Sequence, residues 1–434
     1  MNDKNERFGR NPNRRAVLRR AAGAAAFAAA GGVARRAAAD PALDALMNDG
    51  DGQHQGFGET FDQASRTIHM PKATAPTLSP QTADFTEQAV TTYDGIVARG
   101  GWPQVPKVDE LHLGMHHPSV VDLRKRLAVS GDLDPNAVGN DVYDSYVEAA
   151  VRRFQARHGL STDGVVRELT LMAMNIPAEK RRDQLKINIS RLKTLTTNLG
   201  PRYVVVNLPA ARVEAIEHDV AVARYTAVVG RPSRPSPDIN SKIIAVNFNP
   251  FWTVPVSIVR KDLIPLMEKE PDYLTQNHIR IYDAKHNELQ PSQIDWYSED
   301  AVHYTFRQDP GDFNSLGHLR IDFPSPYGVY MHDTPEKDLF GGDLRYDSSG
   351  CCRVQNVLQL VYWLLDETKA WPPEAINQAI QSGDQVNARL VKPVPLHWVY
   401  VTGWAASDGI VQFREDIYGR DGLGEQVPAQ TTRL

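Results

Sequence analysis

Residues 348–354 have the sequence SSGCCRV and hold both cysteines of this 434-residue chain. Upstream, residues 330–333 read YMHD, so 18 residues separate His332 from Cys351. A thiolate is a strong nucleophile, and an imidazole nearby accepts the thiol proton. The glycine before Cys351 lets a substrate backbone approach closely. This stretch predicts a cysteine-dependent acyl-transfer site.

The two cysteines are neighbours in the chain, and this limits their roles. Consecutive Cα atoms lie about 3.8 Å apart, below the range of roughly 4.4–6.8 Å that disulfides prefer. A reversible redox pair favours C-x-x-C spacing instead. In an extended segment, successive side chains point to opposite faces. We predict that Cys351 faces a cleft as the nucleophile and that Cys352 packs in the core; an inert buried pair is the alternative.

The order and spacing of these residues carry a resemblance. His332 followed by Ser-x-Gly-Cys-x-Arg-Val resembles the signature of the YkuD-type L,D-transpeptidases. Three more segments are similar to the long Gram-negative branch of that family: GGWP at 100–103, NPFWTVP at 249–255 and FREDIYG at 413–419. The resemblance covers roughly residues 85–420. It implies an α+β protein with a β-sandwich-like catalytic domain, a helical lid insertion and a small three-helix peptidoglycan-binding domain.

The resemblance also implies a reaction. Cys351 attacks the carbonyl of the third residue, meso-diaminopimelate, of a donor tetrapeptide stem and releases the terminal D-alanine. The amine of another stem resolves the thioester and gives a 3-3 cross-link. Family members also use water, or attach a protein to the wall, and carbapenems acylate the same thiol. An L,D-carboxypeptidase and a catalytically silent wall-binding scaffold remain alternatives, and no cofactor is implied.

The remaining site residues are assigned around this pair. His332 is the general base, because imidazole titrates near working pH. Backbone N–H groups at Ser349, Gly350 and Cys351, with the Tyr330 hydroxyl, are candidate donors to an oxyanion. Asp333 is a weaker candidate for orienting the imidazole, because consecutive strand side chains point apart; a backbone carbonyl, as in the family, is the favoured partner.

Three residues are candidates for substrate binding. Arg353 either holds a substrate carboxylate or forms a structural ion pair. Trp252 either stacks on substrate or closes a hydrophobic core, and the resemblance favours substrate. Asn249 is assigned to substrate binding by the same resemblance. The histidines show no metal-ligand spacing, so no metal site is predicted.

The N-terminal residues predict export. NRRAVLR at 13–19, an alanine-rich run to Val33 and AAA before Asp40 resemble a twin-arginine signal peptide over residues 1–39. The apolar run is shorter than the roughly 20 residues of a spanning helix. We therefore expect a periplasmic protein with no stable membrane anchor after cleavage.

Charge limits the class of partner. Residues 1–39 hold nine of the 48 basic and two of the 53 acidic residues, which leaves 39 basic and 51 acidic residues, a net charge of −12. Phosphate binding needs clustered cations, so nucleic acid is not expected as a partner. The expected partners are peptidoglycan stem peptides, as donor and acceptor, and wall-attached proteins.

Composition and periodicity divide the rest of the chain. Residues 40–84 are predicted as a flexible linker, 85–107 as a scaffold segment, 108–178 as the helical domain, 179–201 as a helical connector, 202–425 as the catalytic domain with its lid at 259–300, and 426–434 as a tail. In the helical domain, Ser119 and Asp122 predict a capping box, and a helix from Ser145 to His158 is predicted between Asp144 as N-cap and Gly159 as stop. Strands are predicted at 203–208, 220–229, 243–247, 396–403 and 411–414, and a helix at 354–365.

Overall fold

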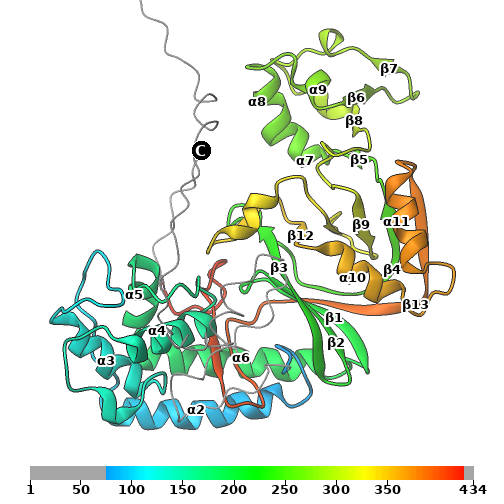
Figure 1. Ribbon diagram of the computed structural model, residues 1–434. Helices are drawn as coiled ribbons and strands as arrows, with labels where there is room; N and C mark the ends of the chain where they lie inside the picture. Colours follow the sequence, from blue (N-terminus) through cyan, green and yellow to red (C-terminus); the bar gives the residue numbers. More distant parts are fainter. Residues whose placement is uncertain (1–74, 425–434) are drawn as a thin grey trace, which may run out of the picture. The chain divides into compact units, whose positions relative to one another are not determined.

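The computed structural model describes residues 75–424 (Figure 1). The predicted signal segment at 1–39, residues 40–74 of the predicted linker and the tail at 426–434 lie outside the described residues. Residues 75–84 of that linker are not flexible coil, since Leu78 is fully buried and helix α2 already begins at Thr82. Within residues 75–424, no helix is both long and apolar enough to cross a membrane.

Residues 202–399 contain one nine-stranded sheet in the order β11-β3-β12-β10-β9-β4-β13-β1-β2. Strand β2 also pairs with β3, so the sheet closes on itself. The predicted mixed helix-and-sheet class is therefore confirmed. The strands are β1 (Arg202–Asn207), β2 (Arg212–Glu217), β3 (Val220–Gly230), β4 (Ile239–Phe248), β9 (Leu319–Asp322), β10 (Met331–His332), β11 (Tyr346–Ser348), β12 (Cys352–Val354) and β13 (Val386–Val399).

Strand β1 shows why the sheet is buried on both faces. It is a nearly continuous apolar run, as expected where both faces of a strand are covered. Val204 and Val206 face the main core, while Tyr203 and Val205 face a second cluster that includes Leu192. Helix α10 (Val357–Leu365) buries its apolar side in the main core, and α11 (Pro373–Gln381) follows it.

Several boundaries differ from the predicted ones. The segment after the cysteines is first strand β12, so helix α10 begins at Val357 and not at 354. The strand predicted at 396–403 is the end of the long strand β13, and β14 (Gly403–Ala405) is a separate strand that pairs with β15 (Val411–Phe413). Strand β2 was not predicted from the sequence. Its Glu214 is buried and is paired with Arg224, which the sequence pattern alone does not indicate.

The helical domain at 108–178 packs around its own apolar core. It contains α3 (Ser119–Val129), the 3₁₀ turn η1 (Pro135–Ala137), α4 (Ser145–His158) and α5 (Glu168–Asn175). Helix α4 has the predicted ends: the Asp144 carboxylate accepts from two N–H groups of the first turn, and Gly159 ends the helix at φ 71°. The capping box at Ser119 is wrong, because Pro118 is the N-cap and makes no side-chain cap.

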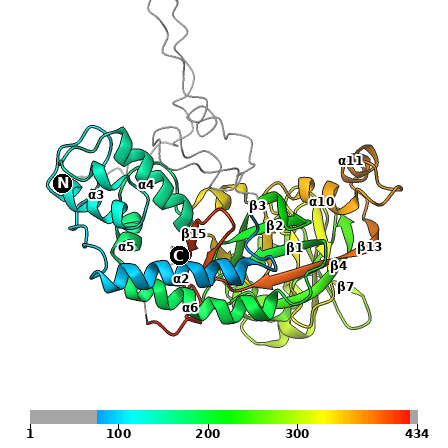
Figure 2. The same cartoon turned by 90° about the horizontal axis from the view of Figure 1, so that it is seen from below.

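Two long helices connect this domain to the sheet. Helices α2 (Thr82–Ala98) and α6 (Ala178–Leu195) run side by side, as Figure 2 shows. Tyr93 of α2 and Leu185 of α6 share a small core with Phe413 of β15. The connector is therefore packed against the C-terminal segment of the chain.

The insertion between β4 and β9 is larger and more mixed than the helical lid predicted at 259–300. It has its own apolar core and a four-stranded sheet in the order β5-β8-β6-β7 (Figure 1). The strands are β5 (Trp252–Thr253), β6 (Ile279–Tyr282), β7 (Glu288–Leu289) and β8 (Thr305–Gln308). The helical turns are α7 (Val256–Ile258), the π-turn η2 (Val259–Leu263), α8 (Ile264–Met267), α9 (Tyr273–Gln276), η3 (Pro291–Gln293) and η4 (Asp300–His303).

Candidate active site

Strand pairing brings the predicted histidine and cysteine onto neighbouring strands. Strands β10 and β12 run parallel, with Met331 opposite Cys352 and His332 opposite Arg353. Met331 and Cys352 are fully buried in the main core. Alternation along β12 gives Cys351, which directly precedes the strand, the same face as Arg353 and His332. Both cysteines are free thiols, and only Cys351 is partly exposed.

The imidazole of His332 is held by the main chain. The ring is 4% exposed, and its Nδ1 contacts the backbone carbonyl of Asp333 at short hydrogen-bond distance. A carbonyl only accepts, so Nδ1 carries the proton and Nε2 keeps its lone pair. Burial, and then the positive charge of Arg353, lowers the pKa of His332 to about 4. The ring is therefore a neutral proton acceptor at neutral pH.

The carboxylate of Asp333 points elsewhere. It pairs with Lys337, and it accepts from the His318 N–H at 3.3 Å. Asp333 thus orients His332 through its carbonyl and not through its side chain, which agrees with the expectation of a backbone partner.

The turn that carries Cys351 is fixed by hydrogen bonds. Ser348 Oγ donates to the Cys351 carbonyl at 2.6 Å and accepts from the Gly350 N–H at 3.1 Å. Gly350 has φ 113°, a conformation that favours glycine. The Gly350 N–H is used inside the turn. No hydrogen bond within residues 75–424 uses the Cys351 N–H, which leaves it available to a ligand.

Electrostatics set the resting state of the thiol. Burial raises the pKa of Cys351, and a backbone hydrogen bond at Tyr330 and the charge of Arg353 oppose that rise. With the imidazole also neutral, the resting state is a protonated thiol and a neutral imidazole on adjacent strands. The proton then moves as the sulfur attacks.

Arg353 forms the structural ion pair that the sequence left as one of two alternatives. Its guanidinium contacts Glu336 on the exposed segment after His332. Tyr330 lies under the guanidinium of Arg320, 4.8 Å from ring centroid to Arg320 Cζ. The side chains of Arg353 and Tyr330 border the face of the sheet on which His332 lies.

Ser349 is linked to the insertion. Its Oγ accepts from Arg234 Nη1 at 2.9 Å, and the same guanidinium pairs with Asp262 of η2. Arg234 belongs to the loop between β3 and β4. This ion pair was not predicted, because its partners lie far apart in the chain.

Two predicted substrate-binding residues have structural contacts instead. Asn249 is 2% exposed, and its amide donates to the carbonyls of Ala379, Ile380 and Asp384, so its assignment to substrate binding is not supported. Trp252 of β5 packs partly buried against the core of the insertion, as in the core-closing alternative.

Two residues near the turn that carries Cys351 were not predicted from the sequence. Ser236 donates to the Gly350 carbonyl at 2.9 Å, and Tyr418 contacts the same loop. Tyr418 lies in the FREDIYG segment, and the resemblance of that segment was the one available signal for it.

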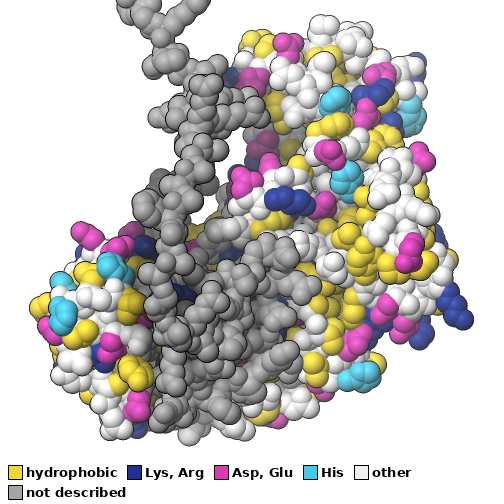
Figure 3. Space-filling model, viewed as in Figure 1, with side chains coloured by type: hydrophobic (Ala, Val, Ile, Leu, Met, Phe, Trp, Pro, Cys, Tyr) yellow, Lys and Arg dark blue, Asp and Glu magenta, His cyan; other side chains and the backbone are white. Residues whose placement is uncertain are grey.

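Among the described residues, no group of three or more His, Cys, Asp or Glu side chains is placed to hold a metal ion. On the face drawn in Figure 3, acidic and basic side chains of the described residues are interspersed.

Comparison with known families agrees with this geometry. Residues 201–381 match the YkuD family, described as the L,D-transpeptidase catalytic domain. This range holds both His332 and Cys351. Residues 116–174 match a second family, described as "Putative peptidoglycan binding domain", and this range covers α3, α4 and most of α5.

A curated relative of this chain comes from Haemophilus influenzae and is named "Putative L,D-transpeptidase". It is 33% identical over 254 residues, which cover 58% of this chain and 51% of the relative. The chain therefore spans about half the length of the curated relative that it matches.

Two solved structures are similar to this chain at low identity. An L,D-transpeptidase from Mycobacterium smegmatis is 12% identical, with a TM-score of 0.24, and the match covers 46% of this chain and 58% of that one. An L,D-transpeptidase from Stackebrandtia nassauensis is 12% identical, with a TM-score of 0.25, over 68% of this chain and 96% of that one.

Proposed function

We propose that the protein is a peptidoglycan L,D-transpeptidase that uses Cys351 as its nucleophile and His332 as its general base. The observation that carries this proposal is the pairing of β10 with β12. It sets a neutral imidazole and a partly exposed thiol on one face of two adjacent strands. The match of residues 201–381 to the catalytic-domain family supports the same reaction class.

In the first half-reaction, Cys351 Sγ attacks the carbonyl carbon of the third stem residue, meso-diaminopimelate. His332 Nε2 takes the thiol proton, and the resulting imidazolium gives it to the leaving amine as the C–N bond to D-alanine breaks. The products are a thioester on Cys351 and free D-alanine. The Asp333 carbonyl keeps the ring in the one tautomer that serves both steps.

Negative charge develops on the carbonyl oxygen during the attack. The Cys351 N–H takes part in no hydrogen bond among the described residues and belongs to the nucleophile itself, so we assign it to the oxyanion. The Gly350 N–H, a candidate from the sequence, is committed to Ser348. The Tyr330 hydroxyl and the Ser349 N–H stay as candidate donors to the oxyanion.

In the second half-reaction, the side-chain amine of another stem attacks the thioester. Its proton passes to His332, the C–S bond breaks, and the thiol is restored with a 3-3 cross-link formed. Water in place of the amine gives a tripeptide, and a protein amine gives a wall-attached protein. Exclusion of water from the cleft favours an amine over water as the acceptor.

The other parts of the chain support action at the wall. Residues 116–174 match a family described as peptidoglycan-binding, and we propose that they hold the enzyme on its polymer. The twin-arginine-like residues 1–39 support export to the periplasm. A carbapenem is expected to acylate Cys351.

The test is product analysis with purified protein. Disaccharide-tetrapeptides are incubated with the enzyme, and the products are separated and weighed by mass spectrometry. Cross-linked dimers that are absent with Cys351→Ala support transfer. Tripeptide as the sole product identifies a carboxypeptidase, and unchanged substrate with wild-type enzyme identifies a silent scaffold.

A further inference from the structure

The peptide bond between Gly350 and Cys351 is held from behind. Its carbonyl oxygen accepts from Ser236 Oγ at 2.9 Å. A trans peptide is planar, with its C=O and N–H pointing in opposite directions. Holding the Gly350 carbonyl toward Ser236 therefore aims the Cys351 N–H away from Ser236. The hydroxyl that fixes one end of this peptide unit sets the direction of the proposed oxyanion donor at the other end.

The orientation of the Ser236 side chain is set by burial and by hydrogen bonds of its hydroxyl. Ser236 is fully buried, and its Oγ also accepts from the Gly230 N–H at 2.9 Å. This second contact leaves the Ser236 hydroxyl proton directed to Gly350. A Cβ at Gly230 would collide with the backbone of Arg234 and Ser236, so the loop folds back on a position that needs glycine.

The hydroxyl of Tyr418 joins the two ends of this loop. It donates to the Gly230 carbonyl at 2.7 Å and accepts from the Ser236 N–H at 3.2 Å. One phenol thus bridges the end of β3 and the residue that holds the Gly350 carbonyl. Burial raises the pKa of Tyr418, so the hydroxyl keeps its proton at neutral pH.

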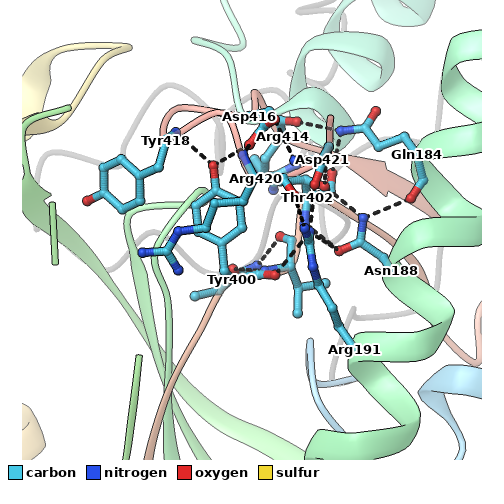
Figure 4. A network of polar contacts seen from close by, with 12 residues as sticks. Gln184, Asn188, Arg191, Tyr400, Thr402, Arg414, Asp416, Tyr418, Arg420 and Asp421 are labelled. Atoms are coloured by element: carbon cyan, nitrogen blue, oxygen red, sulfur yellow. Dashed lines mark hydrogen bonds and ion pairs between the residues drawn. The ribbon is translucent and has the colours of Figure 1, made fainter. Parts of the chain in front are cut away.

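Tyr418 belongs to a polar network in the C-terminal segment (Figure 4). Its ring stacks on Tyr400 with centroids 5.5 Å apart, and its N–H donates to the Tyr400 hydroxyl at 2.8 Å. The Tyr400 hydroxyl donates to Asp416 at 2.6 Å, and the Arg420 guanidinium lies over both rings. The phenol is therefore held in place from its backbone to its ring.

This network is anchored to helix α6. Arg191 pairs with Asp421 at 2.6 Å, and Asp421 accepts from Thr402 Oγ1 at 2.6 Å. Asn188 also donates to Thr402 Oγ1, at 2.7 Å (Figure 4). The connector helix thus fixes the segment that carries Tyr418.

We propose that Ser236 and Tyr418 are positioning residues that aim the Cys351 N–H at the oxyanion of the acylation step. This inference rests on the proposed function. Residues 400–421 lie beyond the range 201–381 that matches the catalytic-domain family. Part of what shapes the active site is therefore supplied by the C-terminal segment and by α6.

The test separates oxyanion stabilisation from thiol reactivity. Acyl-enzyme formation from a tetrapeptide stem is followed by intact mass at saturating donor, and alkylation of Cys351 by iodoacetamide is followed across pH. Alkylation forms no oxyanion, so its rate reports on the reactivity of the thiol alone. We expect Ser236→Ala and Tyr418→Phe each to slow acylation by roughly tenfold with little change in KM. This loss is smaller than the roughly 10²–10³-fold loss in rate on removal of an oxyanion donor, because the donor stays and only its direction changes. The alkylation profile should stay unchanged.

A double-mutant cycle tests whether Tyr418 acts through Ser236. The combined variant should then acylate about as slowly as Ser236→Ala alone, because the second change removes the same effect. Tyr362→Phe is the matched control: it also removes one phenol hydroxyl and its 2.7 Å hydrogen bond, to Asn377 on the outer helices. It should match wild type in both assays.

Three results overturn the proposal: unchanged acylation in Ser236→Ala, additive losses in the double variant, or alkylation that falls in parallel with acylation. Failure of the wild-type enzyme to form an acyl-enzyme is a different result. It rejects the proposed function and is recognised before any variant is compared.

Discussion

His332 donates its Nδ1 proton to the backbone carbonyl of Asp333, its own neighbour in the chain. The carboxylate of Asp333 is engaged by Lys337 and by the His318 N–H. The group that orients the base is thus a part of the main chain that no side-chain substitution removes. This arrangement leads to the first prediction.

Asp333→Asn should keep most of the activity, with kcat/KM within about fivefold of wild type, because the carbonyl that holds the ring is unchanged. His332→Gln should lose about 10²–10⁴-fold, the usual contribution of a general base. Steady-state kinetics with a tetrapeptide donor measure both. A loss in Asp333→Asn as large as that in His332→Gln would show that the carboxylate has a part in catalysis.

The two cysteines should respond in opposite ways. Cys351→Ala removes the nucleophile and should abolish acylation while leaving thermal unfolding close to that of wild type. Cys352→Ala should keep acylation but lower the free energy of unfolding by about 1 kcal/mol, because it removes a fully buried sulfur from the main core. Intact mass and thermal denaturation report the two effects. The reverse pattern would assign the chemistry to the other sulfur.

The acid limb of the rate profile should lie unusually low. Catalysis needs the neutral imidazole, and burial together with Arg353 lowers the pKa of His332 to about 4. The rate should therefore hold as pH falls through 6.5 and be lost as it falls through about 4. At pH 5 an imidazole of ordinary pKa would be only about 3% neutral. A kcat/KM profile measured from pH 3.5 to 8 checks this, and a limb near 6.5 would contradict it.

Arg353 should tune that profile by its charge. Its guanidinium lowers the pKa of both the Cys351 thiol and the His332 imidazole. Arg353→Gln should therefore move the acid limb to higher pH and slow alkylation of the thiol at neutral pH.

Glu336→Gln is the control for Arg353, since it breaks the same ion pair but leaves the positive charge in place. The acid limb of the rate profile of Glu336→Gln should not move to higher pH. If the two variants shift together, the ion pair and not the charge sets the profile.

The ion pair between Arg234 and Asp262 should hold the insertion to the loop beside Ser349. Asp262→Asn should cost less than about 1 kcal/mol of global stability, because the pair is partly exposed. It should nevertheless speed hydrogen exchange across residues 252–308. Glu299→Gln breaks a pair with Arg260 inside the insertion and serves as the control. Equal exchange in Asp262→Asn and wild type would show that the pair does not hold the insertion.

The sequence predicted what depends on local order. The spacing of His332 and the glycine before Cys351 are linear features, and alternation along an extended segment correctly placed Cys352 in the core. The ends of α4 were also predicted, because Asp144 and Gly159 act within one turn of the helix they limit. Such contacts join residues that are close in the chain.

What the sequence did not predict depends on distant partners. Ser236 meets Gly350 across 114 residues, and Tyr418 meets Gly230 across 188. Asn249 was assigned to substrate by the resemblance, and a linear pattern does not show its carbonyl partners at 379–384. Strand β2 was missed for the same reason, since Glu214 is tolerated in the core only because Arg224 pairs with it.

The two ends of the insertion meet at one point of the sheet. The Asn249 N–H donates to the His318 carbonyl at 2.8 Å, and Phe248 stands opposite Leu319 in the ladder of β4 and β9. These antiparallel neighbours would pair equally well if a tight hairpin joined them. We therefore expect that the insertion can be shortened or exchanged at this junction while the order of the strands that carry His332 and precede Cys351 is kept.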